Sequence, residues 1–181
     1  MEDTVSEITR PDPLLEWVSL GAEPGVAPGP LERVRALLNT DDRFHGVDRL
    51  EAHGPRPLRA FRDALRAYLV TGDPVGLEAI AATHPLVVTF DGGAAALAPA
   101  GEDALVADLL AEVHRAHAAG EWPRLKACAN PDCQWIYYDG SRNRSGRWCS
   151  MNECGDVMKA RAYRQRSRRA PAQAAGLESS R

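Results

Sequence analysis

The sequence predicts a mainly α-helical (α+β) protein, in which an N-terminal helical domain with one β-hairpin precedes a small C-terminal module held together by cysteines. Three observations predict this class. Apolar residues recur at helical spacing in the N-terminal part, one stretch near 86–99 has the composition and turn of a hairpin, and all four cysteines stand between residues 128 and 154. With 181 residues and 44% hydrophobic content, the chain can bury one medium core beside a smaller unit.

The helical domain is expected over residues 11–123, after a polar and disordered start at 1–10. Its clearest helix is 57–72, where Leu58, Phe61 and Leu65 recur at intervals of three and four and Gly72 marks the end. Pro and Gly residues bound the other segments with helical patterns, because Pro is favoured in a first turn and Gly after a last one. The full set of expected helices is 11–21, 31–40, 57–72, 73–85 and 102–122.

The pattern becomes extended after residue 85. Residues 86–90 and 94–99 are expected to pair as a β-hairpin, since the Asp91-Gly92 pair supplies the positive φ angles that tight turns need. The polar segment 41–56 is expected to be a surface loop rather than a second metal site around His45 and His53, because no ligand spacing supports a site.

His114 and His117 stand three residues apart on the expected helix 102–122. They are expected to be exposed or capping residues, because half a metal site needs a partner helix with a Glu-x-x-His motif.

The cysteines form two pairs, each with four residues between its members, and fifteen residues separate the pairs. Four thiolates at such spacing match a closed tetrahedral zinc site. The expected ligands of a structural zinc ion are Cys128, Cys133, Cys149 and Cys154.

Residues around the cysteines favour a treble-clef type of finger over 124–170. The turn between Cys128 and Cys133 is rich in Asn, Pro and Asp, residues 134–138 have strand composition, and Arg147-Trp148 is expected to begin the return strand. Ser150 and Glu153 form a capping box that opens a helix. Pro171 is expected to stop that helix near Arg169 or Ala170, which leaves 171–181 as a disordered tail.

Two other uses of the cysteines are less favoured. Disulfides need an oxidising compartment, and the opening MEDTVSEITR has neither a basic nor an apolar secretion segment. Catalytic zinc sites keep one position open for water, which a fourth cysteine closes. We therefore expect a cytoplasmic protein, and no apolar run reaches the length of a membrane span.

Charge is distributed unevenly along the chain. Residues 124–169 hold eleven Lys and Arg against four acids, a net charge of +7, and the whole chain carries −3, which leaves −10 elsewhere. Such a basic segment predicts a face that binds nucleic acid, while a solvated helix paired with the acidic domain is the alternative. The candidate nucleic-acid-binding residues are Arg142, Arg144, Arg147, Lys159, Arg161, Arg164, Arg166 and Arg168.

The aromatics Trp135, Tyr137 and Tyr138 admit two interpretations. If these rings stack on unpaired bases, RNA is the favoured partner. If they instead fill the small core of the finger, DNA remains the favoured partner. The second interpretation is preferred, because a small finger has little else to bury.

Residues 137–166 resemble the C-terminal finger of the CGNR zinc-finger family, bacterial proteins described as stress-induced transcription regulators. The resemblance is carried by the loop, the helix start and the helix, at Asp139, Ser141, Arg142, Asn143, Arg147, Trp148, Cys149, Ser150, Met151, Cys154, Gly155 and Lys159. The signature Cys-Gly-Asn-Arg reads Cys154-Gly155-Asp156-Val157 in this chain. The resemblance implies a helical domain before the finger and a DNA-binding role.

Two functional hypotheses follow. In the first, the protein is a DNA-binding transcription regulator, and its helical domain senses a small-molecule effector or forms a homodimer. In the second, the N-terminal domain holds a small-molecule pocket for a biosynthetic step, and the finger holds an RNA such as tRNA or a partner protein. No catalytic motif such as a phosphate loop or a Gly-x-Ser-x-Gly elbow is present, so no catalytic residue is assigned and the enzyme hypothesis lacks support.

Overall fold

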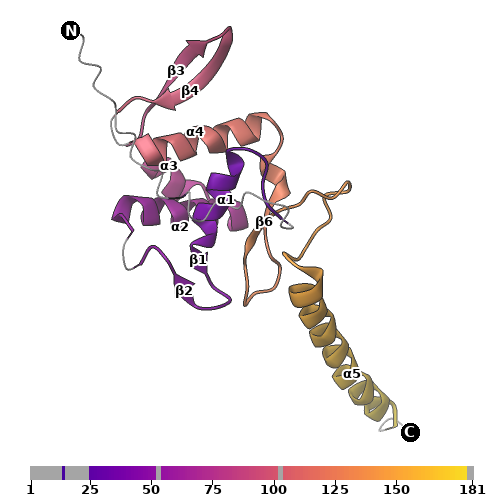
Figure 1. The fold of residues 1–181 in the computed structure, drawn as a ribbon. Coiled ribbons are helices and arrows are strands. Elements are labelled where there is room, and N and C mark those ends of the chain that lie inside the picture. Colours follow the sequence, from indigo (N-terminus) through magenta and orange to yellow (C-terminus); the bar gives the residue numbers. More distant parts are fainter. Residues whose placement is uncertain (1–13, 15–24, 52–53, 102–103, 179–181) are drawn as a thin grey trace, which may run out of the picture.

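The computed structural model describes residue 14 and residues 25–51, 54–101 and 104–178. The helices are α1 (Leu31–Asn39), α2 (Arg56–Thr71), α3 (Val75–Ala81), α4 (Ala104–Ala118) and α5 (Asp156–Glu178), with a 3₁₀ turn at Trp122–Arg124 and a π-helical turn at Met151–Gly155. The antiparallel strand pairs are β1 (Asp41–Asp42) with β2 (Val47–Asp48), β3 (Leu86–Asp91) with β4 (Ala94–Pro99), and β5 (Leu125–Ala127) with β6 (Ile136–Tyr138). The α+β class is confirmed (Figure 1).

The main hydrophobic core lies between α1, α2 and α4 and extends into the finger. The apolar stripe expected on α2 is buried, with Leu58, Phe61 and Leu65 in the core. Leu125 of β5 and Ile136 of β6 belong to the same cluster. The finger strands are therefore part of the core of the helical domain.

The helix expectations hold with small shifts where the described residues cover them. Gly72 ends α2 with a φ of +79°, a left-handed angle that suits glycine. The helix expected over 102–122 is shorter, because α4 ends at Ala118 and a separate 3₁₀ turn follows. The helix expected over 11–21 lies outside the described residues except for Leu14, which is buried in the core.

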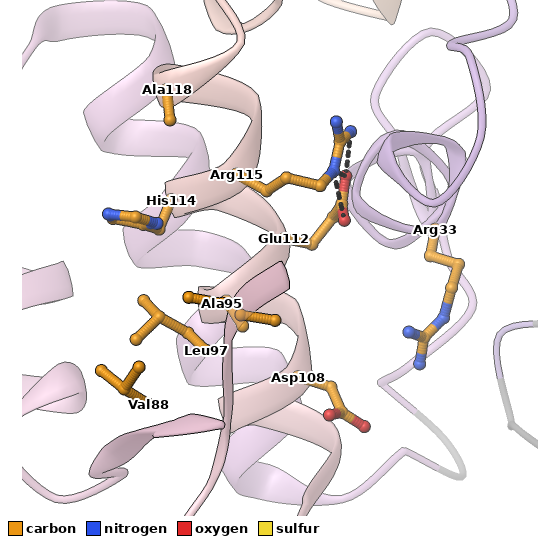
Figure 2. Close-up of a pocket in the computed structure, with 11 residues that line it drawn as sticks. Arg33, Val88, Ala95, Leu97, Asp108, Glu112, His114, Arg115 and Ala118 are labelled. Atoms are coloured by element: carbon orange, nitrogen blue, oxygen red, sulfur yellow. Dashed lines mark hydrogen bonds and ion pairs between the residues drawn. The ribbon is translucent and has the colours of Figure 1, made fainter. Parts of the chain in front are cut away.

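The expected β3–β4 hairpin forms and projects from the helices (Figure 1), but its turn is Gly92-Gly93 rather than the expected Asp91-Gly92 pair. Asp91 pairs with Ala94, and the two turn residues Gly92 and Gly93 both have positive φ, at +54° and +83°. A cavity of about 630 Å³ is lined by residues of this hairpin, of α4 and of α1 (Figure 2). Its walls combine Val88 and Leu97 of the hairpin with charged residues of α4.

Three further local expectations are wrong. Strand β6 pairs with β5, not with Arg147-Trp148, and the Arg147 carbonyl oxygen instead accepts a hydrogen bond from the Ala129 N–H at 2.8 Å. The expected loop 41–56 contains the short β1–β2 pair. Helix α5 continues through Pro171 to Glu178, because proline removes one backbone hydrogen bond without necessarily ending a helix.

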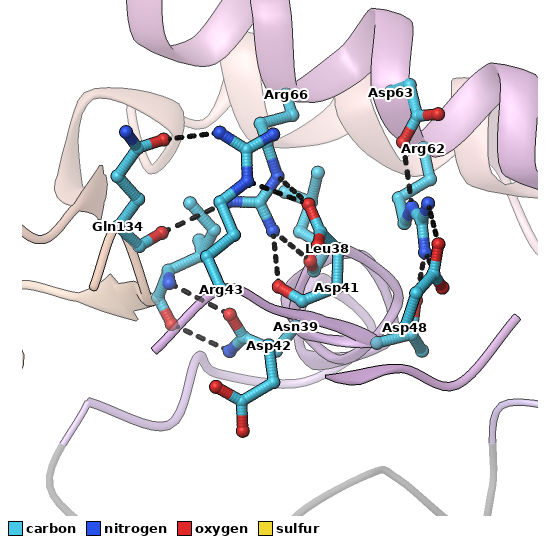
Figure 3. Close-up of polar contacts among 12 residues, drawn as sticks. Leu38, Asn39, Asp41, Asp42, Arg43, Asp48, Arg62, Asp63, Arg66 and Gln134 are labelled. Atoms are coloured by element: carbon cyan, nitrogen blue, oxygen red, sulfur yellow. Dashed lines mark hydrogen bonds and ion pairs between the residues drawn. The ribbon is translucent and has the colours of Figure 1, made fainter. Parts of the chain in front are cut away.

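Buried polar side chains join the helical domain to the finger (Figure 3). Asn39 of α1 donates to the Ile136 carbonyl oxygen and accepts from the Ile136 N–H, each at 2.8 Å. The Arg66 guanidinium of α2 donates to the backbone oxygens of Leu38 and Gln134. Burial lowers the pKa of Arg66 to about 10, which leaves it charged at neutral pH. The outer edge of β6 is therefore satisfied by α1, and the start of the strand is held by α2.

Replacing Asn39 with alanine is expected to destabilise the protein by about 1–3 kcal/mol, because the buried N–H and C=O of Ile136 would lose their partners. Denaturant unfolding of the zinc-loaded protein measures the change. Asn152→Ala, at an exposed position of the finger, is the matched control. Equal midpoints for the Asn39→Ala variant and the control would contradict this role of Asn39.

Candidate metal centre and basic face

The first cysteine pair lies on a tight turn between β5 and β6. The Asn130 carbonyl oxygen accepts from the N–H groups of Cys133 and Gln134, at 2.9 and 3.1 Å, and the Asn130 side chain accepts from the Asp132 N–H at 3.3 Å. Gln134 then takes a left-handed φ of +52°, and the Trp135 N–H hydrogen-bonds to the Cys133 thiol. The turn predicted from Asn, Pro and Asp thus directs both sulfur atoms inward.

The second cysteine pair flanks the start of the C-terminal helix. Ser150 is the N-cap, and its hydroxyl accepts from the Glu153 N–H at 3.3 Å, as the capping box predicts. Cys154 lies in the π-helical turn that follows. Gly155 has little room for a Cβ, since an added one would lie 3.2 Å from Met151 Sδ and 3.3 Å from Trp148 Cδ1. This close packing places the start of the helix beside Trp148, which itself packs against the cysteine cluster.

The four cysteine sulfurs meet at one point. All four Sγ atoms lie within 4.8 Å of one another. Cys149 Sγ lies 3.7 Å from Cys133 Sγ and 3.8 Å from Cys154 Sγ. A tetrahedral zinc ion with Zn–S bonds of about 2.3 Å separates its ligands by about 3.8 Å, whereas a disulfide bond is about 2.05 Å. The four cysteines are free thiols in a geometry that can coordinate structural zinc, and the set leaves no open position.

Protons compete with a metal for these thiols. The hydrogen bond from Cys149 lowers the pKa of Cys133 to about 6, and the same bond raises the pKa of Cys149. Burial raises the pKa of Cys154 to about 11, although the Asn130 amide donates to its sulfur at 3.5 Å. Zinc must displace these protons, so metal affinity falls as the pH falls.

A buried carboxylate, which the sequence did not single out as an organising residue, shapes the loop that follows β6. Asp139 accepts from the N–H groups of Ser141 and Gly146, at 3.0 and 2.7 Å, and from Lys126 Nζ at 2.7 Å. Burial would raise the pKa of Asp139, but these hydrogen bonds hold it well below its usual range. Arg124 donates to the carbonyl oxygens of Asp139 and Ser141. Two basic residues of the finger, Arg124 and Lys126, therefore serve the fold.

The structure divides the candidate nucleic-acid-binding residues into two groups. Arg161 pairs with Asp132 at 2.7 Å, and Lys159 pairs with Asp156 at 3.3 Å. The others are exposed, and no ion pair of theirs is found within the described part of the chain. They are Arg142, Arg144 and Arg147 of the loop and Arg164, Arg166 and Arg168 of α5. The Arg147 guanidinium lies over the Trp148 ring, 5.2 Å from its centroid.

The finger aromatics serve packing, and both His114 and His117 are exposed. Tyr137 is buried, and Trp135 and Tyr138 are half-buried against the cysteine cluster and the main core. Their packing supports the core-filling interpretation. His117 stacks on Trp122 with a ring separation of 4.9 Å, and partial burial lowers its pKa. Among the described residues, only the four cysteines form a group of three or more possible metal ligands.

The cavity beside the β3–β4 hairpin has a wall of charged residues from α1 and α4 (Figure 2). Its most buried acid, Glu112, is held by Arg115 through contacts of 2.6 and 2.9 Å. Arg115 also pairs with Glu121 at 2.9 Å. Glu112 and Arg115 are thus occupied with each other, while Arg33, Asp108 and His114 also line the cavity. None of the helices in the described part is long and apolar enough to span a bilayer.

Comparison with known proteins supports the finger. Residues 124–167 match the family model of the CGNR zinc finger, which confirms the resemblance over the metal centre and the first half of α5. The match does not extend into the helical domain. No curated protein matches the chain. The C-terminal module is thus a zinc finger of the CGNR type, with Asp156-Val157 in place of the Asn-Arg of the signature.

Removing zinc with a chelator is expected to expose residues 128–133 and 149–155 while α1, α2 and the β5–β6 pair stay protected. The reason is that the turn and the helix start depend on the metal, whereas Leu125 and Ile136 lie in the main core. Hydrogen exchange before and after chelation measures this, with zinc re-addition as the control. Loss of protection in α1 and α2 as well would show that the metal supports the whole core.

Replacing Asp139 with asparagine is expected to lower stability by about 1–3 kcal/mol at neutral pH, because the buried network loses its negative charge and one of its two acceptor oxygens. Since the folded pKa of Asp139 is depressed, its contribution is present above the unfolded value of about 3.9 and is lost as the pH falls below it. The difference between wild type and variant should therefore shrink below about pH 4. Asp132→Asn is the control, because its ion pair is exposed and worth little. A difference that stays constant with pH would contradict the assignment.

Proposed function

We propose that the protein is a DNA-binding transcription regulator whose finger contacts the phosphate backbone through its basic face. The basic face is defined as the exposed cations of the loop and of α5, namely Arg142, Arg144, Arg147, Arg164, Arg166 and Arg168. One observation carries the proposal: α5 extends away from the helical domain, and residues 163–168 are exposed (Figure 1). Between Asp156 and Glu178 the helix has no acidic residue.

The charge distribution argues against an intramolecular role for this helix. Within the described part, the ion pairs of α5 join Lys159 to Asp156 of the same helix and Arg161 to Asp132 of the finger. None of them reaches the acidic helical domain. A basic helix that its own chain does not neutralise attracts a polyanion, because binding releases counterions from the phosphates.

The loop supports the same proposal from a second element. The backbone of the loop is held from inside by hydrogen bonds of Asp139, Lys126 and Arg124. The three loop arginines of the basic face therefore extend into solvent from an ordered backbone. Arg147 is further ordered by the Trp148 ring. A cation that is already ordered loses less entropy when it meets a phosphate.

Duplex DNA is favoured over single-stranded RNA by the burial of the finger aromatics. Stacking on successive unpaired bases needs several accessible rings, whereas Tyr137 is buried and Trp135 is half-buried, and Tyr163 is the exposed aromatic of the described part of α5. An exposed helix that carries arginines can instead enter a major groove, where arginine pairs with guanine edges.

Binding to mixed duplex DNA and to total tRNA across a salt series tests the proposal. The Arg164→Ala/Arg168→Ala variant should weaken DNA binding and reduce the salt slope by up to about 2, because each phosphate that a cation neutralises contributes roughly 0.9 to that slope. The Arg49→Ala/Arg56→Ala variant removes the same charge from exposed positions of the helical domain and should leave the slope unchanged.

Three outcomes would count against this function. Equal reductions of affinity in both variants would mean that net charge alone governs binding. Absence of binding at moderate salt would remove the nucleic-acid role altogether. Tighter binding to tRNA than to duplex DNA would identify RNA, not DNA, as the partner.

A further inference from the structure

A second cavity lies between the helical domain and the metal centre. Its volume is about 280 Å³. Three segments that are far apart in the sequence line it: the β1–β2 connection, the turn before β6, and the start of α5. Three of the candidate zinc ligands, Cys133, Cys149 and Cys154, form one wall of the cavity. The other side chains that matter for its chemistry are Asp42, Phe44, His45, Trp135, Glu153 and Val157.

Asp42 is exceptional among the buried carboxylates of the described residues. Glu32, Glu112 and Asp139 each pair with an arginine or a lysine. Asp42 is only 8% exposed, yet its carboxylate meets His45, whose backbone N–H lies 3.2 Å away and whose ring nitrogen lies 2.8 Å away.

The histidine is a weak partner for this carboxylate, because its side chain is 68% exposed. Figure 3 shows the Asp42 carboxylate turned away from the arginines that bind Asp41. A buried carboxylate whose cationic partner is an exposed histidine ring can take a stronger one, since charge-assisted hydrogen bonds to a permanent cation are stronger than neutral ones.

The surroundings of Asp42 also favour a cation. No lysine or arginine is among the described residues that line the cavity, and Glu153 adds a second carboxylate. Phe44 and Trp135 supply aromatic rings, which attract cations through their faces. Zinc held by four thiolates carries a net charge of about −2, so the loaded centre adds to the negative potential.

By the resemblance described above, Val157 stands where the Cys-Gly-Asn-Arg signature reads arginine. Its side chain is aliphatic, is 43% exposed and lines the cavity. The neighbouring Asp156 does not replace that positive charge, because it is acidic and pairs with Lys159.

We propose that this cavity binds a guanidinium group that the chain does not itself supply, either on a small molecule or on an arginine side chain of a partner. The guanidinium displaces the His45 ring from Asp42, pairs with that carboxylate through two hydrogen bonds, and stacks on the exposed ring of Phe44. A planar head suits this combination better than an ammonium ion does. A second metal ion is disfavoured, because Asp42, His45 and Glu153 do not form a group of possible ligands apart from the four cysteines. Such a site would exist whether or not the basic face binds nucleic acid.

The first experiment uses the full-length zinc-loaded protein and NMR titration with agmatine, with the tripeptide Gly-Arg-Gly, and with Gly-Lys-Gly as the comparison. Both guanidinium probes should shift the Trp135 indole and His45 signals, and Asp42→Asn should weaken binding at least tenfold. Tighter binding of agmatine points to a small-molecule source, and tighter binding of the peptide points to a partner protein. Equal shifts with Gly-Lys-Gly, or no effect of Asp42→Asn, would overturn the proposal.

The second experiment introduces an arginine into the chain itself, at a position that lines the cavity. Val157→Arg should raise the melting temperature by about 2–4 °C relative to Val157→Leu, which adds bulk without charge, and should abolish agmatine binding. Adding Asp42→Asn should cancel the gain, since the two side chains act as a pair. If Val157→Arg is no more stable than Val157→Leu, or still binds agmatine with wild-type affinity, the proposal fails.

Discussion

The convergence of four sulfur atoms is the constraint on which the finger depends. Sulfurs from two separated turns must come within 4.8 Å of one another, and each turn has its own means of arriving there. Asn130 closes the first turn, and Ser150 opens the helix that carries the last cysteine. Because a metal accepts only a narrow range of ligand positions, both turns are fixed relative to each other, and so are the loop and the helix that leave them.

The helical domain also restrains the finger. Strand β6 lies between β5 on one edge and the Asn39 side chain on the other, and Arg66 holds the carbonyl of Gln134, the residue after Cys133. Side chains of α1 and α2 thus hold the backbone that directly follows the first cysteine pair. The acidic and basic parts of the chain meet through these specific buried contacts, and the basic face remains turned to solvent.

The sequence predicted those features that depend on local chemistry. Amphipathic spacing located α1, α2 and α4, the Asp-Gly pair located the hairpin turn, and cysteine spacing located the metal ligands. Contacts between distant residues were missed. Nothing near Asn39 or Arg66 shows that each will bind backbone beyond residue 133, and nothing around Asp139 shows that Lys126 will neutralise it in a buried position. Strand β6 has a composition that fits either partner, so packing of Leu125 into the core decided the pairing.

The attachment of α5 has a mechanical consequence. The helix has 23 residues, which gives a length of about 34 Å, and its ion pair to the rest of the finger, between Arg161 and Asp132, lies in its second turn. It therefore acts as a lever whose pivot is the cysteine cluster. A rotation of about 10° at the pivot would move the far end by roughly 6 Å, since displacement scales with the length of the arm. Small changes in sulfur geometry are thus amplified at the tip of the helix.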